Sequence, residues 1–383
     1  MAMSGQSRPG CVALAGVNRK APLHRKLSTP PTSSRHEPVT PPPKALTRFT
    51  QDLTALATAP TPDRPLAIAV SGGPDSMALL ALAVAAFPNA VIAATVDHRL
   101  RTASANEAAM VADWCRAHAI SHATLAPDTP PAGASIQAQA RHARYALLAD
   151  WAIAGHATAL ATAHHADDQA ETFLMRAARA SGPAGLAGIR PRWTYEQHRW
   201  HASYPKDAVA AVADVTPLPI VRPLLTWRRA DLRALSADLP FVDDPSNTDP
   251  RHDRTAVRTL LAAGHLDPLG LAAAAAHCCE VDATLSQTID WLWRTRSLDA
   301  EAGECRLDMT DLPRELRRRL ARRAIGDVRL VDGITEGRWS DAANIESLLD
   351  ALDSGGTATK AGVLASAGHG IWHFRPAPPR RSD

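Results

Sequence analysis

The sequence contains no paired cysteine motif and no long hydrophobic run. Its five cysteines show no CxxC spacing, which argues against a disulfide framework, a cysteine-rich zinc site and an iron–sulfur cluster. Such use of cysteine is typical of a reducing compartment. No stretch approaches 18 uninterrupted apolar residues, so neither a transmembrane helix nor a membrane partner is expected. The cytoplasm is the expected location.

The composition predicts two or three folded domains and a separate basic arm. The 383 residues are 45% hydrophobic and 21% charged, which is enough to build packed cores. Residues 1–48 carry eight Lys or Arg and one acid, so the rest of the chain is net acidic despite the total charge of +3. Residues 1–45 are proline-rich and lack apolar periodicity, which predicts disorder. Their composition resembles a transit peptide, but without an amphipathic pattern a solvated tail or an over-called start site is favoured.

Strand-like and helical patterns alternate from residue 46 onward. Apolar runs at 66–70, 91–96, 122–125 and 157–163 predict strands, and the periodicity of 46–57, 77–87, 105–119, 135–153 and 166–180 predicts helices. This order predicts an α/β fold with a doubly wound parallel sheet. Polar clusters at 71–76, 97–101 and 164–171 follow predicted strands, and ligands bind at that end of such sheets.

The later part of the chain is predicted to be mainly helical. Helical patterns cover 227–237, 253–263, 268–296 and 311–325, and residues 355–374 have strand-like alternation. We therefore divide the chain into a disordered basic arm (1–45), an α/β domain (46–225), a smaller, mainly helical domain (226–330) and a small C-terminal tail with β-structure (331–383).

A glycine-containing loop joins the first predicted strand to the next helix. Its sequence is Ser71-Gly72-Gly73-Pro74-Asp75-Ser76. Glycines let the backbone approach an anion closely, and the amide groups at a helix N-terminus point toward it. No Gly-Lys-Ser/Thr follows, so the loop is not a Walker A motif. A simple capping turn is the alternative, which the full string at a strand–helix junction makes less favoured.

This loop resembles the PP-loop of the N-type ATP pyrophosphatases, enzymes that split ATP between the α and β phosphates. Further segments follow in order: Val96-Asp-His-Arg-Leu-Arg101, His164-His-Ala-Asp-Asp-Gln-Ala-Glu-Thr172, Ser181-Gly-Pro-Ala-Gly-Leu-Ala-Gly188, Arg222-Pro-Leu-Leu225 and Asp244-Pro-Ser-Asn-Thr-Asp249. Together they resemble the tRNA(Ile)-lysidine synthetase family over residues 64–260. The segment that begins at His164 and its glycine-rich continuation are the most specific part.

The resemblance implies an AMP-forming ligase that uses ATP and Mg²⁺. In this family ATP adenylates O2 of the wobble cytidine of an isoleucine tRNA with a CAU anticodon, releasing pyrophosphate. The ε-amino group of free L-lysine then attacks C2 and displaces AMP, which gives lysidine. The implied partners are that tRNA and free lysine, and a homodimer is compatible with the sequence. The resemblance makes 46–225 the catalytic, ATP-binding domain and 226–330 the domain expected to contact tRNA.

The resemblance assigns the ATP-binding loop and the catalytic carboxylates. The loop residues are Ser71, Gly72, Gly73, Pro74, Asp75 and Ser76, and Asp75 is also the candidate Mg²⁺ ligand. The candidate catalytic residues are Asp97, Asp168 and Glu171. On a helix, Asp168 and Glu171 share one face, where either could hold the lysine ammonium or accept a proton from the attacking amine. Capping of a helix N-terminus is the alternative. We favour function for Asp168, whereas the two interpretations are balanced for Glu171.

Basic and polar residues of the same motifs are the candidate lysine or tRNA contacts: His98, Arg101, His165, Arg176, Arg222, Asn247, Arg254, Arg258 and Arg318. The segment around Asn247 reads equally well as a turn, and Thr255-Ala256 departs from the family pattern. Arg318 belongs to a run, 314–323, with six arginines and one acid. Such a run is usually a solvated face, but in an otherwise acidic body contact with the RNA backbone is favoured.

Four other functions compete with this interpretation. A related tRNA sulfur transferase commonly needs a catalytic cysteine pair, and Cys115 has no partner in the sequence. A small-molecule adenylating synthetase of the amidotransferase type needs a glutaminase, for which no motif is visible. Two His and two Asp in 164–168 also fit a metal hydrolase, which the preceding PP-loop disfavours. A non-catalytic RNA-binding relative is disfavoured by the intact loop.

Overall fold

The structure is a computed structural model that describes residues 27–28, 40–97, 99, 103–129, 136–196, 217–243, 253–335, 339–340 and 343–378. It divides into two units. Unit 1 is Met1–His164 and Pro191–Thr255, and unit 2 is His165–Arg190 and Ala256–Asp383. The boundaries predicted after residues 225 and 330 divide the chain differently from these two units, and they stay a prediction.

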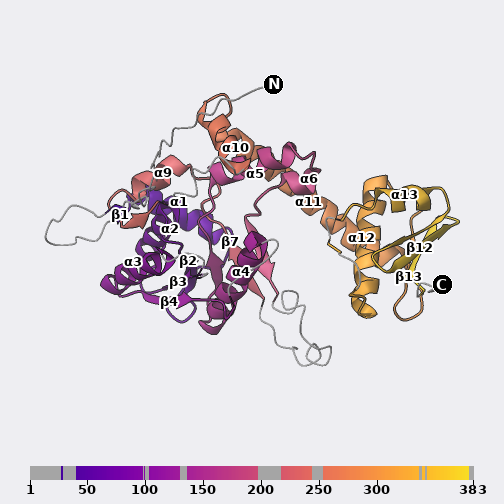
Figure 1. The fold of residues 1–383 in the computed structure, drawn as a ribbon, viewed down its shortest axis with the longest axis horizontal. Helices are drawn as coiled ribbons and strands as arrows, with labels where there is room; N and C mark the ends of the chain where they lie inside the picture. The colour runs from indigo at the N-terminus through magenta and orange to yellow at the C-terminus, as the bar shows by residue number, and fades with distance from the viewer. Residues whose placement is uncertain are drawn as a thin grey trace, which may run out of the picture. The chain divides into compact units, whose positions relative to one another are not determined.

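A six-stranded sheet forms the centre of unit 1 (Figure 1). Its order is β4-β3-β2-β5-β7-β6, with β2 Leu66–Ala69, β3 Val91–Val96, β4 Ser121–Leu125, β5 Ala159–Ala161, β7 Leu218–Val221 and β6 Arg192–Tyr195. The first five strands are parallel, and β6 pairs antiparallel with β7. The predicted α/β class with a doubly wound sheet is confirmed, with one antiparallel strand added at the edge.

Helices cover both faces of this sheet. Helices α1 Pro43–Thr54, α2 Pro74–Ala86, α3 Ala103–Ala117 and α9 Arg229–Leu235 share one core with Ile68 of β2. The neighbouring Ala67 belongs to the core on the opposite face, which is built with α4 Ile136–Ala154. This alternation follows from the two-residue period of a strand. Helix α2 is apolar on nearly all sides, as burial between the sheet and other helices requires.

Parts of the predicted arm are ordered. Leu27–Ser28 form β1, which pairs antiparallel with β8 Phe241–Val242. Pro43 begins α1, where its fixed φ suits the first helical position. Disorder is therefore corrected for these residues, because backbone pairing and helix formation hold them. Residues 1–26 and 29–39 lie outside the described residues, and so does the prediction made for them.

The helices of unit 2 continue the chain from His165. They are α5 Ala166–Ala177, α6 Pro183–Leu186, the greater part of α10 Asp253–Ala262, and α11 Pro268–Arg296. Asp267 caps α11 by accepting hydrogen bonds from the amides of Leu269 and Gly270, both at 3.0 Å. The bounds of α11 are those predicted from its periodicity.

A second, antiparallel sheet follows α11 in unit 2. Its order is β11-β12-β13-β10-β9, and the strands are β9 Ser297–Leu298, β10 Cys305–Asp308, β11 Thr357–Lys360, β12 Val363–Gly368 and β13 Ile371–Pro376. With α12 Arg314–Val331 and α13 Glu346–Asp353 they build one core, which also contains Ile289 and Leu292 of α11. We call residues 297–378 the C-terminal sheet domain. The sequence predicted β-structure only in 355–374 and missed β9, β10 and α13.

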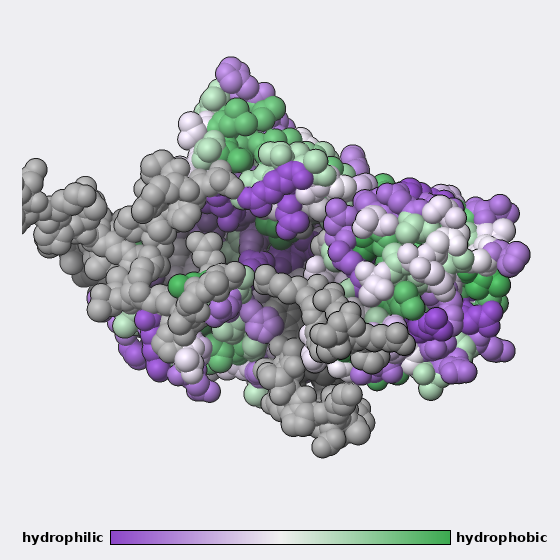
Figure 2. Space-filling view, turned by 45° about the vertical axis from the view of Figure 1, so that its right-hand side comes forward, coloured by the Kyte–Doolittle hydropathy of each residue, from purple (hydrophilic) through white to green (hydrophobic). Residues whose placement is uncertain are grey.

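The described surface mixes hydrophilic and hydrophobic side chains (Figure 2). A hydrophobic area lies at the top of that view, where Figure 1 draws α10, and Leu260 of this helix is 48% exposed. None of the helices within the described ranges combines the length and apolarity needed to cross a bilayer.

Candidate functional site

The glycine loop of unit 1 adopts a conformation that only glycine tolerates well at one position. Gly72 has φ +79°, and an added Cβ would lie 3.4 Å from the Met110 side chain. Its carbonyl accepts a hydrogen bond from the amide of Val242 at 2.9 Å. Gly73 caps α2, which begins at Pro74. The loop therefore leads directly into a helix N-terminus, whose amides and dipole favour an anion.

The two serines of the loop are joined to one another. The Ser76 hydroxyl oxygen accepts from the Ser71 amide at 3.2 Å and from the Ser71 hydroxyl at 3.3 Å, and the Ser76 hydroxyl donates to the Gly73 carbonyl at 2.8 Å. Ser76 is buried, whereas Ser71 is exposed. These hydrogen bonds close the loop, and they place two hydroxyl groups beside the start of α2.

Polar residues follow the strands on both sides of β2. Asp97 follows β3, and its Oδ1 accepts from the Arg99 amide at 2.8 Å and from the Ser104 hydroxyl at 2.6 Å. His164 follows β5, and its Nδ1 lies 3.0 Å from the Thr162 hydroxyl. Since β3, β2 and β5 are adjacent and parallel, these residues and the glycine loop lie along one edge of the sheet, as predicted.

In unit 2, His165 and Asp168 cap the start of α5 reciprocally. The buried His165 accepts at Nδ1 from the Asp168 amide at 3.3 Å, and Asp168 Oδ2 accepts from the His165 amide at 3.2 Å. The predicted helix α5 is confirmed, so Asp168, Glu171 and Thr172 do share one face. Capping explains part of the Asp168 geometry, and its side chain is still 15% exposed.

Glu171 and Arg258, both predicted site residues, form an ion pair. Arg258 Nε of α10 donates to Glu171 Oε1 at 2.8 Å. The Glu171 side chain is only 1% exposed, and it is the one acidic side chain classed as buried within the ranges that the structure describes. A carboxylate in this position requires a compensating cation. The pairing links two motifs that lie 87 residues apart.

Gln169 joins the segment that begins at His164 to the glycine-rich stretch 181–188 and the residue after it. Its amide group donates to the carbonyls of Ala187 and Ile189, each at 3.2 Å, and accepts from the Ile189 amide at 2.7 Å. Gly188 has φ +60°, and a Cβ there would come within 2.7 Å of Gln169 Oε1. The sequence alone did not single out Gln169 as a residue with a role, although it lies within the motif.

Arg222, predicted as a lysine or tRNA contact, is buried in unit 1. The sequence did not indicate this burial. Its guanidinium donates to the Tyr145 hydroxyl at 3.3 Å, and burial lowers its pKa. Arg141 lies over the Tyr145 ring at 5.1 Å. Tyr145 of α4 therefore contacts two arginines, and neither Tyr145 nor Arg141 was singled out from the sequence.

Two of the remaining predicted contacts lie on helices of the described residues. Arg176 lies in the last turn of α5 and Arg254 lies on α10. His98, Arg101 and Asn247 lie outside the described residues. Among the residues that are described, no group of three or more His, Cys, Asp or Glu is arranged to hold a metal ion.

The chain is similar to a known domain family and to several known proteins. A model of the PP-loop domain matches residues 45–263. The tRNA(Ile)-lysidine synthase of Novosphingobium aromaticivorans is 42% identical over 88% of this chain and 96% of that protein. The synthase of the same name from Zymomonas mobilis is 40% identical over 82% of this chain and 89% of that protein.

The chain belongs to the tRNA(Ile)-lysidine synthase family. Among solved structures, a U34-tRNA thiolase from Methanococcus maripaludis is similar over 61% of this chain and 76% of that chain, with 14% identity and a TM-score of 0.45.

In this member of the tRNA(Ile)-lysidine synthase family, the arginines of α12 have acidic or carbonyl partners within the protein. Arg318 pairs with Glu315 and, at 2.7 Å, with Glu346. Arg314 contacts Glu346, Asp350 and Asp353 at 2.6–3.0 Å. Of the other five, four bind Asp353, Glu315, Asp282, Asp290 and the Ala343 carbonyl, and Arg329 donates to the Ala361 carbonyl. Contact of Arg318 with RNA stays a prediction, and its observed role is to join α12 to α13.

The ion pairs of Glu346 predict an acid-sensitive contribution to stability. The guanidinium groups of Arg318 and Arg314 lower the pKa of Glu346 from 4.5 to about 2. The folded pKa lies below the unfolded one, so the pairs stabilise the fold above pH 4.5, and this is lost as the pH falls through about 2. We expect Glu346→Gln to remove at most about 1 kcal/mol at pH 7, since the site is half-exposed, and to change little at pH 2. Equal effects of Glu346→Gln on thermal unfolding at both pH values would contradict this.

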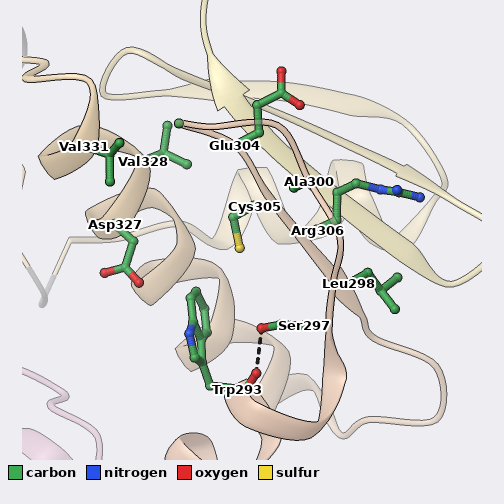
Figure 3. Close-up of a pocket in the computed structure, with 11 residues that line it drawn as sticks. Trp293, Ser297, Leu298, Ala300, Glu304, Cys305, Arg306, Asp327, Val328 and Val331 are labelled. Carbon is green, nitrogen blue, oxygen red and sulfur yellow. Dashed lines mark hydrogen bonds between the residues drawn. The ribbon is translucent and has the colours of Figure 1, made fainter.

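A pocket of about 240 Å³ in unit 2 is lined by residues of α11, β9, β10 and α12, and none of its lining residues is a predicted site residue. Figure 3 shows the Cys305 sulfur pointing toward Trp293, with Asp327 and Val328 of α12 beside it. Burial and the nearby Asp327 carboxylate raise the pKa of Cys305 to about 12. Burial also raises the pKa of Cys115 to about 12. Neither thiol is therefore a nucleophile at neutral pH.

Alkylation should distinguish these cysteines from the half-exposed pair on α11. At pH 8 only about one molecule in ten thousand carries a thiolate at Cys305 or Cys115, so iodoacetamide should modify Cys278 and Cys279 first. Modification of Cys305 should accelerate about tenfold per pH unit below its pKa. Peptide mass spectrometry reads each site. Reaction of Cys305 at the rate of Cys278 at pH 8 would refute the raised pKa.

Proposed function

We propose that this protein is an AMP-forming ligase that converts the wobble cytidine of CAU-anticodon tRNA(Ile) into lysidine, using ATP and free L-lysine. One observation carries the proposal: the PP-loop geometry at the β2–α2 junction occurs in a chain whose 40–42% identical relatives are tRNA(Ile)-lysidine synthases. The family resemblance supplies the reaction. The geometry supports the roles proposed below for individual residues.

The first step is adenylation. The cytosine O2 attacks the α-phosphorus of ATP, and the bond to the β-phosphate oxygen breaks to release pyrophosphate. The amides around Gly72 and Gly73 and the hydroxyls of Ser71 and Ser76 bind the phosphates, supported by the dipole of α2. The carboxylates of Asp75 and Asp97 offer hard oxygen ligands of the kind Mg²⁺ prefers. When bound, Mg²⁺ would offset the phosphate charge.

The second step joins lysine. The ε-amine attacks C2 of the adenylated base, and AMP leaves with the former O2. The amine must lose protons, because free lysine is mostly protonated at neutral pH. Asp168 is the base in this proposal, since its carboxylate lies at the start of α5 on the face that it shares with Glu171 and Thr172. Glu171, buried and paired with Arg258, has a positioning role in this proposal: the pair joins α10 to the face of α5 that carries Asp168.

The partners of this reaction are tRNA(Ile), lysine and ATP. A tRNA substrate supports a cytoplasmic location. The contacts proposed for lysine or RNA are those of the family motifs, His98, Arg101, His165, Arg176, Arg222, Asn247, Arg254 and Arg258. Residues 226–330 are proposed to contact tRNA, and a homodimer is compatible with the chain.

The test measures AMP and pyrophosphate release from ATP by the purified protein. The reaction contains lysine and a CAU-anticodon tRNA(Ile) transcript, and the control transcript carries U at the wobble position. We expect release only with the cytidine, together with lysine on the tRNA. Release that needs neither tRNA nor lysine would instead indicate a small-molecule adenylating synthetase.

A further inference from the structure

One carboxylate in the middle of α11 binds arginines from two separate parts of unit 2. Arg190, which follows α6, donates from Nη2 to Asp282 Oδ2 at 2.6 Å. Arg319 of α12 donates from Nη2 to Asp282 Oδ1 at 2.7 Å. The Asp282 side chain is 15% exposed, so both pairs are largely shielded from water. Such charge-assisted hydrogen bonds are stronger than neutral ones.

Asp282 lies in the middle of α11, in a stretch of the helix without buried side chains. The helix has 29 residues and is therefore about 43 Å long. The helix packs on α5 and α6, and its Ile289 and Leu292 belong to the core of the C-terminal sheet domain. No side chain between Ala275 and Ile289 is among the buried residues of this helix. The ion pairs of Asp282 therefore connect this stretch to the segment after α6 and to α12.

The ion pairs continue in both directions from Asp282. Arg190 also donates to the Ala184 carbonyl of α6 at 3.1 Å, and it follows Ile189, whose backbone Gln169 clamps. On the other side, Arg319 Nε donates to Glu315 at 2.9 Å. Gln169, the residue after Asp168, holds the backbone of Ile189. The next residue, Arg190, binds Asp282, and Asp282 binds Arg319 of α12.

We propose that Asp282 is a positioning residue for tRNA: it sets the placement of the C-terminal sheet domain relative to α5. The inference rests on the proposed function, because it requires a tRNA held at both places. ATP and lysine are too small to span a 29-residue helix. A change in that placement alters the binding of tRNA and leaves the binding of ATP and lysine as it was.

The test compares Asp282→Asn with Asp290→Asn. Asp290 lies two turns further along the same helix and pairs with Arg323 at an exposed position, so it is the matched control. For Asp282→Asn we expect about a tenfold rise in KM for tRNA, with KM for ATP and lysine within twofold of wild type. Asp290→Asn should leave all three unchanged. An unchanged KM for tRNA in Asp282→Asn, or equal rises for all three substrates, would overturn the proposal.

Two further measurements keep the proposal testable. If Asp282→Asn does not fold, Arg190→Gln removes only the link toward α6 and should give the same tRNA-specific rise in KM. Hydrogen exchange of residues 184–190 and 315–319 should accelerate in the folded Asp282 or Arg190 variant and not in Asp290→Asn. This readout needs no activity, so it separates the two claims. Wild-type protein that forms no lysidine refutes the proposed function, whereas unchanged exchange refutes the role of Asp282.

Discussion

Replacement of Asp168 by alanine is expected to reduce lysidine formation by a factor of about 10²–10⁴, the range that a positioned proton acceptor contributes. The variant should remain folded, because the lost cap at His165 costs only about 1 kcal/mol. Lysine-dependent modification of the tRNA measures the first effect, and thermal unfolding measures the second.

Asp168→Asn separates chemistry from capping. The asparagine oxygen can still accept from the His165 amide, so most of the lost stability should return. The amide cannot accept a proton at neutral pH, so activity should not return. Near-normal turnover by Asp168→Asn would reduce Asp168 to a capping residue.

Replacement of Arg258 by methionine should lower the free energy of unfolding by about 3 kcal/mol, because it takes the guanidinium away from a buried carboxylate. Lysidine formation should fall at the same time, since Glu171 then loses its fixed position. Urea unfolding followed by tryptophan fluorescence measures the stability change.

Two variants control for this effect. Arg116→Met removes the arginine of an exposed ion pair with Asp113 on α3 and should cost under about 0.5 kcal/mol, the usual cost at a surface position. The double variant Glu171→Gln with Arg258→Met carries no buried charge at this site, and it should recover part of the loss. A single Arg258→Met that unfolds like Arg116→Met would show that the ion pair contributes little.

The elements of the fold could be predicted where their signal is local. The periodicity of 268–296 gave α11, and the apolar run 91–96 gave β3, because both patterns repeat within the element. Strands β9 and β10 were missed, since each is short and the distant partner of β10, Ile371–Pro376, lies far along the chain; β9 pairs only with β10. Helix α12 extends beyond its predicted end at 325, because Val328 is buried in the core of its domain.

The site was predictable as a set of motifs and not as a set of contacts. The glycine loop, Asp168 and Glu171 follow from residue types and spacing. The Glu171–Arg258 pair and the Gln169 clamp join residues that lie 87 and about 20 positions apart, which no periodicity reveals. The arginines of 314–323 suggested an RNA-binding face because their acidic partners, such as Glu346 and Asp282, lie on α13 and α11.

The most direct test of lysidine formation is the identity of the wobble nucleoside after reaction. CAU-anticodon tRNA(Ile) is incubated with the protein, ATP and lysine, then digested to nucleosides and analysed by mass spectrometry. The proposed reaction predicts a cytidine enlarged by the mass of one lysine less one water. This nucleoside should be absent when ATP or lysine is omitted. An unmodified cytidine in the complete reaction, with ATP consumed, would contradict it.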